Sequence, residues 1–246
     1  MYIEDGDTRI LIDAGISLRA IETALQALGT SARLLSGILI THEHSDHTKG
    51  LYQLALRTGV PIYGEVITLR NILAAMQDIM PDRFTAFAAG VGPYGIGDFR
   101  VTVFPTSHDV PCVGYRVEGT ATVALATDLG QMEEAVYEGL AGADFVILEC
   151  NHDEEMLKMG SYPIYLKRRI LSDCGHLSNA SCAKAVCRLI QSGCRHFVLG
   201  HLSASNNLPS LALGAVCGAL IQSGVRPGEV TVDVAPRFEM SRVFEL

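Results

Sequence analysis

The sequence predicts a mixed α/β fold, an α/β sandwich rather than a regular βαβ repeat. Short apolar runs rich in β-branched residues alternate along the chain with segments whose apolar residues have helical spacing. This interleaving favours sheets covered by helices. No repeat period and no linker rich in proline or serine is visible, so we expect one continuous domain over residues 1–246.

The individual elements follow from local signals. Residues 1–7 are acidic and turn-like, and Ser17 is a suitable N-cap for a helix that Gly29 closes. The same periodicities predict the remaining elements. We place strands at 9–12, 34–40, 60–63, 99–104, 113–117, 122–126, 145–148, 197–199 and 230–234, and further helices at 51–59, 131–140, 179–190 and 208–221.

The composition excludes several classes of protein. Hydrophobic residues make up 48% of the 246 residues, which is too many for a disordered chain. No apolar run approaches the roughly 20 residues that cross a bilayer, and the start lacks a secretory pattern, so we expect a cytoplasmic protein with no membrane partner. Seven cysteines without a Cys-x-x-Cys pair indicate reduced, mostly buried thiols. A net charge of −8 argues against coating nucleic acid by bulk charge, but it allows a local basic site.

The strongest chemical signal is the segment Thr41-His42-Glu43-His44-Ser45-Asp46-His47, which lies between an expected strand and an expected helix. Imidazole and carboxylate groups together suit Zn, Mn or Fe better than Ca or Mg. In a turn that leaves a strand end, His42 and His44 can point to one cation, and Asp46 and His47 can point to a neighbouring one. The segment therefore predicts a site for two metal ions.

Three further candidate ligands follow apolar strands. They are His108, Asp128 and His201. Because strand ends gather at one edge of a sheet, these side chains are expected to converge with the first four on a single cleft. Each residue alone is weak evidence, and the joint pattern is strong.

The order His-x-His-x-Asp-His, then His, Asp and His, resembles the metallo-β-lactamase superfamily over almost the whole chain. This resemblance implies an αββα sandwich, formed by a single domain of residues 1–246, with a binuclear site at one edge. It also implies that His42, His44 and His108 hold one metal, that Asp46, His47 and His201 hold the other, and that Asp128 bridges them. Asp13 matches the aspartate of the first superfamily motif and would steady the ligand turn.

Finer motifs resemble the YycJ (WalJ) family within this superfamily. They are the segments at residues 148–153, 169–179, 200–207 and 234–237. The resemblance implies a bacterial, cytoplasmic, metal-dependent 5′ to 3′ exonuclease acting on DNA. Members of this family usually open with a strand and a Gly-Ser-Ser-Gly-Asn turn, and this sequence begins after that segment. We therefore expect the N-terminal strand of the sandwich to be missing.

Outside the ligand set, His176 lies in a polar loop that leads into an expected helix. We interpret His176 as a catalytic residue that contacts a substrate phosphate or the leaving oxygen. For Ser178 and Asn179, helix capping is the preferred interpretation. Lys167, Arg168 and Arg169 form the densest basic cluster, which could bind backbone phosphates, although a solvated helix face is the preferred interpretation.

The other histidines and several cysteines lie outside the predicted ligand set. His196 precedes a strand and is expected to be structural, whereas His152 lies in a turn that can face the cleft, and neither enters the ligand set. Cys150, Cys174 and Cys182 are expected to pack in the interior.

The ligand pattern predicts a binuclear hydrolase with two divalent ions, Zn or Mn, and Asp46 orienting the attacking water, and the resemblance implies that it cleaves phosphodiesters. DNA is the expected substrate. The same ligands also activate water toward a thioester, so a thioesterase of the hydroxyacylglutathione hydrolase type is one alternative. A metal-loaded regulatory protein with little turnover is another.

Overall fold

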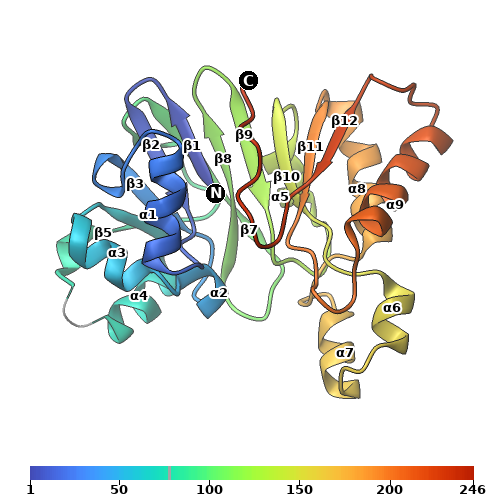
Figure 1. The fold of residues 1–246 in the computed structure, drawn as a ribbon, viewed down its shortest axis with the longest axis horizontal. Coiled ribbons are helices and arrows are strands. Elements are labelled where there is room, and N and C mark those ends of the chain that lie inside the picture. Colours follow the sequence, from blue (N-terminus) through green and yellow to red (C-terminus); the bar gives the residue numbers. More distant parts are fainter. Residues whose placement is uncertain (77–78) are drawn as a thin grey trace. The chain divides into compact units, whose positions relative to one another are not determined.

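A computed structural model describes residues 1–76 and 79–246, which form two compact units. Unit 1 contains residues 1–103, 110–113 and 117–120, and unit 2 contains residues 104–109, 114–116 and 121–246. The division between the units cuts through two long strands, β7 (Phe99–Thr106) and β8 (Cys112–Glu118), and through the loops that follow them. Figure 1 shows the course of the chain.

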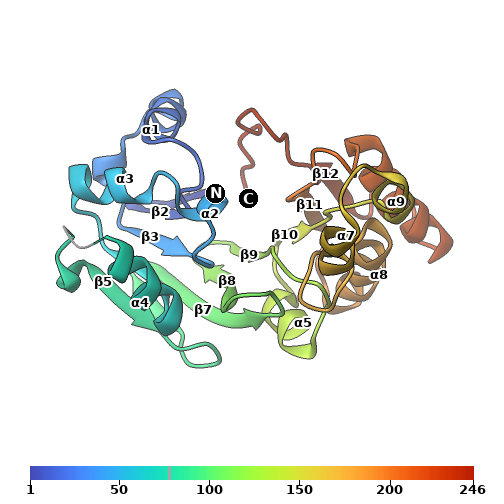
Figure 2. The ribbon, with the colours of Figure 1, turned by 90° about the horizontal axis from the view of Figure 1, so that it is seen from below.

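Unit 1 is built on a five-stranded sheet in the order β1-β2-β3-β4-β5. Strand β1 pairs with β2 in antiparallel register, and the other neighbours are parallel. Helices α1, α3 and α4 lie beside this sheet (Figures 1 and 2). The strands are β1 (Tyr2–Asp5), β2 (Thr8–Ile12), β3 (Gly37–Ile40), β4 (Ile62–Glu65) and β5 (Phe84–Phe87), and the helices are α1 (Leu18–Ala27), α2 (Ser45–Thr48), α3 (Leu51–Thr58) and α4 (Val66–Ala75).

A seven-stranded sheet follows the order β12-β11-β10-β9-β8-β7-β6. Strand β10 (Phe145–Glu149) pairs in parallel with β9 (Thr122–Ala126) and with β11 (His196–Gly200), and β11 pairs in parallel with β12 (Thr231–Val234). The hairpin of β6 (Tyr94–Ile96) and β7 is antiparallel.

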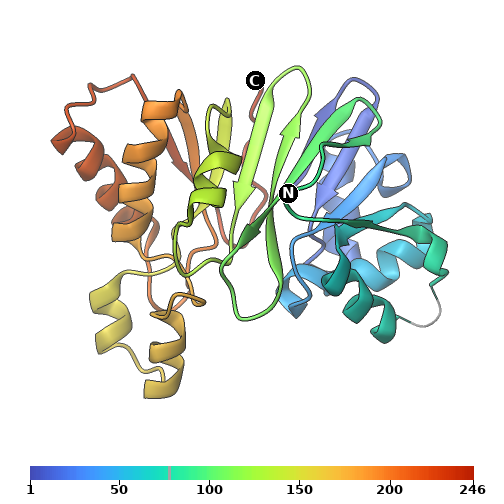
Figure 3. The same cartoon turned by 180° about the vertical axis from the view of Figure 1, so that it is seen from behind.

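The core of unit 2 lies between its strands and three helices, α5 (Glu134–Leu140), α8 (Asn179–Leu189) and α9 (Pro209–Gln222). Two shorter helices, α6 (Glu154–Met159) and α7 (Ile164–Ile170), lie beyond the ends of β10 and β11 and away from the sheet face that α8 and α9 cover (Figures 1 and 3). No helix among the described residues is long and apolar enough to cross a membrane.

Most expected elements are present with shifted ends. The Ser17 side chain caps α1 by accepting a hydrogen bond from the Ala20 N–H, and Gly29 follows this helix with φ 74°. The strand expected at 34–40 is shorter, because residues 32–34 form a 3₁₀ turn before β3 begins. Two further 3₁₀ turns cover Pro81–Arg83 and Ile190–Ser192.

The expectation of a turn-like start is wrong. Tyr2–Asp5 forms strand β1, which pairs with β2 across a two-residue turn at Gly6 and Asp7. Gly6 has φ 56°, a conformation that tight hairpin turns need and that glycine adopts without strain. The charged side chains at residues 4 and 5 concealed this strand, because an edge strand tolerates polar residues.

Candidate metal centre

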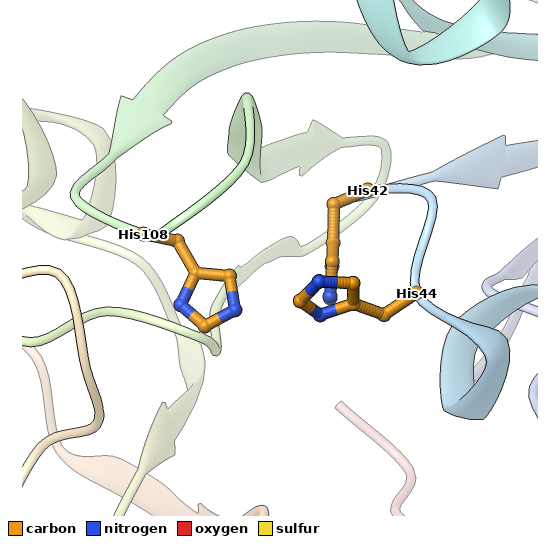
Figure 4. A group of neighbouring side chains, drawn as sticks. All are labelled: His42, His44 and His108. Carbon is orange, nitrogen blue, oxygen red and sulfur yellow. The ribbon is translucent and has the colours of Figure 1, made fainter. Parts of the chain in front are cut away.

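In unit 1 the candidate ligands follow the end of strand β3. Thr41 and His42 come directly after Ile40, and His42 is fully buried. His44 is the N-cap of helix α2, and Figure 4 shows its ring beside that of His42. The ring centroid of His42 lies 4.6 Å from that of His44 and 4.1 Å from that of His47. The turn therefore gathers three imidazole rings.

Asp13 holds this turn in place. Its Oδ1 accepts a hydrogen bond from the Thr41 N–H at 2.9 Å, and its Oδ2 accepts from the Thr41 hydroxyl at 2.9 Å and from His47 Nδ1 at 2.7 Å. Because a carboxylate only accepts, His47 carries its proton on Nδ1 and presents the lone pair of Nε2. That Nε2 lies 3.9 Å from Oδ2 of Asp46, which is exposed on α2. Asp13 thus contacts the ligand turn in the way that the superfamily resemblance implies.

The backbone around Asp46 leaves no room for a side chain at Gly15. A Cβ added at Gly15 would lie 1.5 Å from the carbonyl oxygen of Asp46. The neighbouring Ala14 N–H donates to the His47 carbonyl at 2.8 Å. The loop after β2 and the start of α2 are thus packed backbone against backbone.

In unit 2 three candidate ligands follow three strands. His108 lies on the loop after β7 (Figure 4), Asp128 lies two residues after β9, and His201 directly follows β11. Strand β10 pairs in parallel with both β9 and β11, so Asp128 and His201 leave the sheet at the same edge. Asp128 is 2% exposed. The expectation that strand ends bring these residues together is confirmed within unit 2.

The spacing around Asp128 is typical of ligands that share a cation. Oδ1 of Asp128 lies 3.6 Å from His201 Nε2 and 3.9 Å from His108 Nε2. Both distances exceed a good hydrogen bond. Two ligands held at about 2.1 Å by one tetrahedral cation lie about 3.4 Å apart, which is close to these separations. Burial lowers the pKa of His108, which favours the neutral imidazole that binds metal.

Glu149, the last residue of β10, is a candidate functional residue that sequence reasoning missed. It is fully buried. Its Oε1 accepts hydrogen bonds from Nδ1 of His201 at 2.7 Å and of His176 at 2.8 Å. Its Oε2 accepts from the backbone N–H groups of Leu129 and Leu177. Burial alone would raise the pKa of Glu149, but the hydrogen bonds from the two histidines hold it well below its usual value.

A sequence signal for Glu149 did exist. It is a single carboxylate that closes an otherwise apolar strand, and a buried charge needs partners. Asp128, Glu149, His176 and His201 each offer a ligand atom, and these atoms all lie within 4.8 Å of one another.

His176 lies beside this cluster. Although burial lowers its pKa, the hydrogen bond and the charge of Glu149 outweigh that effect and raise the pKa of His176 above its ordinary value. The backbone N–H of His176 donates to the Ile170 carbonyl at the end of α7 at 3.0 Å. Its neighbour Ser178 caps α8 by accepting from Ser181 N–H, and Asn179 bonds to Asn207, so both are structural.

Three residues of these turns have strained backbones. Among the described residues, the non-glycine positions with positive φ are Asp13 at 59°, Asp128 at 58° and His201 at 56°. A left-handed conformation costs an L-residue about 1 to 2 kcal/mol. Such strain is typical of functional sites, where the surrounding structure holds a side chain in one orientation.

The comparisons with known proteins agree with this arrangement. Residues 8–202 match the model of the β-lactamase superfamily domain. The exodeoxyribonuclease YycJ of Bacillus anthracis is 36% identical over 93% of this chain and 87% of its own length. The exodeoxyribonuclease WalJ of Streptococcus pneumoniae serotype 2 is 34% identical over 92% of this chain and 86% of its own. The chain belongs to the YycJ/WalJ family of the β-lactamase superfamily.

A comparison with solved structures finds the same fold. The metallo-β-lactamase fold protein YhfI from Bacillus subtilis superposes with a TM-score of 0.69 at 19% identity, covering 95% of this chain and 87% of its own. The predicted α/β class and the predicted metallo-β-lactamase type are therefore confirmed.

The residues present in this YycJ/WalJ chain fit divalent metal ions. The donors in each unit are imidazole nitrogens and carboxylate oxygens, the set that suits transition metals. Nδ1 of His47 is bound to Asp13, and Nδ1 of His201 is bound to Glu149. Each ring thus has its second nitrogen fixed by a carboxylate, which is the usual support of a metal-binding histidine.

Other expectations for the chain have mixed outcomes. His196, the first residue of β11, is structural, since its Nε2 lies 3.1 Å from Oδ2 of Asp233 on β12. Cys150 and Cys182 are buried, as expected. The interior position expected for Cys174 is wrong, because this residue is exposed in the loop before His176 and its thiol lies 3.8 Å from the Ser107 hydroxyl.

Proposed function

We propose that the protein is a metal-dependent exodeoxyribonuclease that removes nucleotides from DNA in the 5′ to 3′ direction. The observation that carries this proposal is the pair formed by His176 and the buried carboxylate of Glu149 beside Asp128 and His201. The names of the YycJ and WalJ relatives support the activity and the substrate. The proposal places the protein in the cytoplasm, with residues 1–246 working as one domain.

The proposed ligand set follows the family resemblance. His42, His44 and His108 hold one divalent ion, Asp46, His47 and His201 hold the second, and Asp128 bridges the two. Zinc and manganese both suit these donors. When bound, such ions supply a nucleophile from water near neutral pH and neutralise the charge that develops on the phosphate.

The protein side chains supply positioning and proton transfer. Asp46 is exposed on α2, where it can orient an attacking water. His176 carries a proton on Nδ1 that Glu149 holds, and its raised pKa increases the protonated fraction near neutral pH. The doubly protonated ring can then donate its other proton, on Nε2, to the leaving oxygen of the phosphodiester.

This proton donor favours a phosphodiester over a thioester. The leaving group of a thioester is a thiolate, whose conjugate acid has a pKa of about 8.5, and it departs without protonation. The leaving group of a phosphodiester is an alkoxide, which is far more basic and gains much more from a donor. A thioesterase would therefore depend little on His176, and a regulatory protein would not depend on it at all.

The test is digestion of end-labelled single- and double-stranded DNA with added Mn or Zn, run beside an acyl-glutathione substrate. We expect metal-dependent release of nucleotides from the 5′ end, and the His176→Ala variant should cleave DNA about 10²-fold more slowly with unchanged metal content. A 5′-phosphorylated end should be preferred over a 5′-hydroxyl end.

Each outcome separates the candidates. Turnover of acyl-glutathione without cleavage of DNA assigns a thioesterase. Absence of turnover on both substrates in the metal-loaded protein assigns a binding protein. Loss of metal in His176→Ala makes His176 a ligand and removes it from the proposed acid role.

A further inference from the structure

Helix α7 presents exposed apolar and basic side chains together. Ile164 is 69% exposed and Tyr165 is 72% exposed. Arg168 is also exposed, and it lies four residues after Ile164 and three after Tyr165, so the three side chains share one helical face. We call these three residues the α7 face. Exposed aromatic and aliphatic side chains that cluster together mark a binding surface, whereas single exposed apolar side chains are ordinary.

The charges of α7 are all positive. The helix carries Lys167, Arg168 and Arg169 and no acidic residue, although the chain as a whole has a net charge of −8. Lys167 donates to the Lys158 carbonyl at the end of α6, and Arg169 pairs with Asp109. In the described part of the chain, no carboxylate forms an ion pair with Arg168. Its charge is therefore available to an anionic partner.

The end of α7 adjoins the candidate site of unit 2. The Ile170 carbonyl accepts the His176 N–H, and a Cβ added at Gly175 would lie 2.2 Å from that carbonyl oxygen. The Gly175 carbonyl lies 3.2 Å from Nδ1 of His108. The ion pair of Arg169 with Asp109 joins α7 to the residue after His108. These links tie the C-terminal end of α7 to the loops that carry His176 and His108, so a strand that runs along α7 toward this end reaches the candidate site.

We propose that the α7 face binds the single-stranded part of the nucleic-acid substrate beyond the scissile phosphate, with a base stacked on Tyr165 and a backbone phosphate on Arg168. This inference rests on the proposed function and adds a substrate-binding surface to it. An aromatic ring beside a cation is the combination that single-strand-binding surfaces use. Stacking accepts any base, which suits an enzyme that degrades DNA regardless of sequence.

The experiment compares long and minimal substrates. KM and kcat are measured for a single strand of about 12 nucleotides, for a dinucleotide and for bis(p-nitrophenyl) phosphate, with the metal-loaded full chain. Tyr165→Ala and Arg168→Ala should each raise KM for the long strand at least about fivefold while kcat and the rates on the two small substrates stay unchanged. Arg168→Ala should also reduce the salt dependence of log KM by about 0.7.

Two matched variants serve as controls. Tyr165→Phe keeps the ring and should keep the KM of the parent. Arg226→Ala removes an exposed arginine that pairs with Glu229 in the turn after α9, and it should change nothing. Both α7 positions are exposed, so loss of folding does not explain a change.

The two proposals fail in different ways. If the parent degrades DNA and the α7 variants keep its KM for the long strand, the inference is wrong and the nuclease assignment stands. If the parent does not cleave DNA, the nuclease assignment fails, and fluorescence anisotropy with the same labelled strand then tests the α7 face alone. Absent or equal binding by parent and variants overturns it.

Discussion

Nδ1 of His201 lies 2.7 Å from a carboxylate oxygen of the buried Glu149. The same oxygen also faces Nδ1 of His176, so one carboxylate sets the orientation and the tautomer of both rings. A residue at the end of a core strand therefore couples a candidate metal ligand to a candidate proton donor.

Replacing Glu149 with Gln tests this coupling. An amide offers one accepting oxygen, so either the two ring N–H groups or the two backbone N–H groups of Leu129 and Leu177 lose their acceptor. We expect Glu149→Gln to lower the free energy of unfolding by about 1 to 3 kcal/mol and metal affinity by about 10- to 100-fold. Urea unfolding and metal titration measure these effects. Glu155→Gln, at an exposed position on α6, is the control and should resemble the parent.

Acid pH should lower the unfolding free energy of the metal-free protein, because Glu149 loses its stabilising contribution. The folded-state pKa of Glu149 lies below its unfolded value of about 4.5, so its contribution to stability is complete above that pH and declines as the pH falls. The difference in unfolding free energy between the parent and Glu149→Gln should therefore shrink from pH 5.5 toward pH 3.5. Urea titrations in the presence of a chelator check this, and a constant difference would contradict the lowered pKa.

Metal content should be close to two ions per chain after reconstitution. Because the proposed bridge serves both ions, Asp128→Ala should reduce the occupancy of both, whereas the exposed Asp82→Ala should leave the content unchanged. Elemental analysis after dialysis gives the count. A parent that retains one ion or none rules out a binuclear centre.

His108→Ala and His201→Ala should each abolish hydrolysis while the protein remains folded, because both residues lie in loops after strands. The rate losses of the two variants should not add, because removing either residue of one catalytic unit already removes most of the activity of that unit. Single-turnover rates and circular dichroism of the two single variants and of the double variant provide the comparison. A double variant far slower than either single one would separate the two residues into different functions.

Gly15→Ala should damage the turn that carries Asp46 and His47. Its added Cβ would overlap the Asp46 carbonyl oxygen, and backbone cannot move aside as a flexible side chain does. We expect a loss of at least about 1 to 3 kcal/mol in unfolding free energy together with weaker metal binding. Gly95→Ala, where no atom lies within 4 Å of the added Cβ, should change stability by less than about 0.5 kcal/mol. Equal stability of both variants would contradict the close approach.

Local sequence was sufficient to predict the strands that carry candidate ligands at their ends, and those ligands themselves, but not β1, β5 or β6. The apolar run of β9 and the aspartate two residues beyond it are neighbours in the chain, and so are His42 and β3. Such predictions depend on the spacing of apolar residues and on the polar residue that ends an apolar run, and both features lie within about ten residues of sequence. The capped helix α1 was predicted for the same reason.

Long-range partners could not be predicted in this way. Glu149 forms hydrogen bonds with His201, 52 residues away, and with His176, 27 residues away. The residues next to Glu149 in the sequence do not indicate these partners. Strand β1 was missed because pairing with β2, and not its own composition, makes it a strand.

The amino-acid sequence thus specified the chemistry of the centre, since residue types and strand ends are local properties. The parallel register of β9, β10 and β11 decided which of those groups meet in unit 2, and the hydrogen bonds of Asp13 and Glu149 decided which ring nitrogen His47 and His201 present. Hydrogen bonding of a buried carboxylate depends on neighbours in space, and folding alone brings those neighbours together.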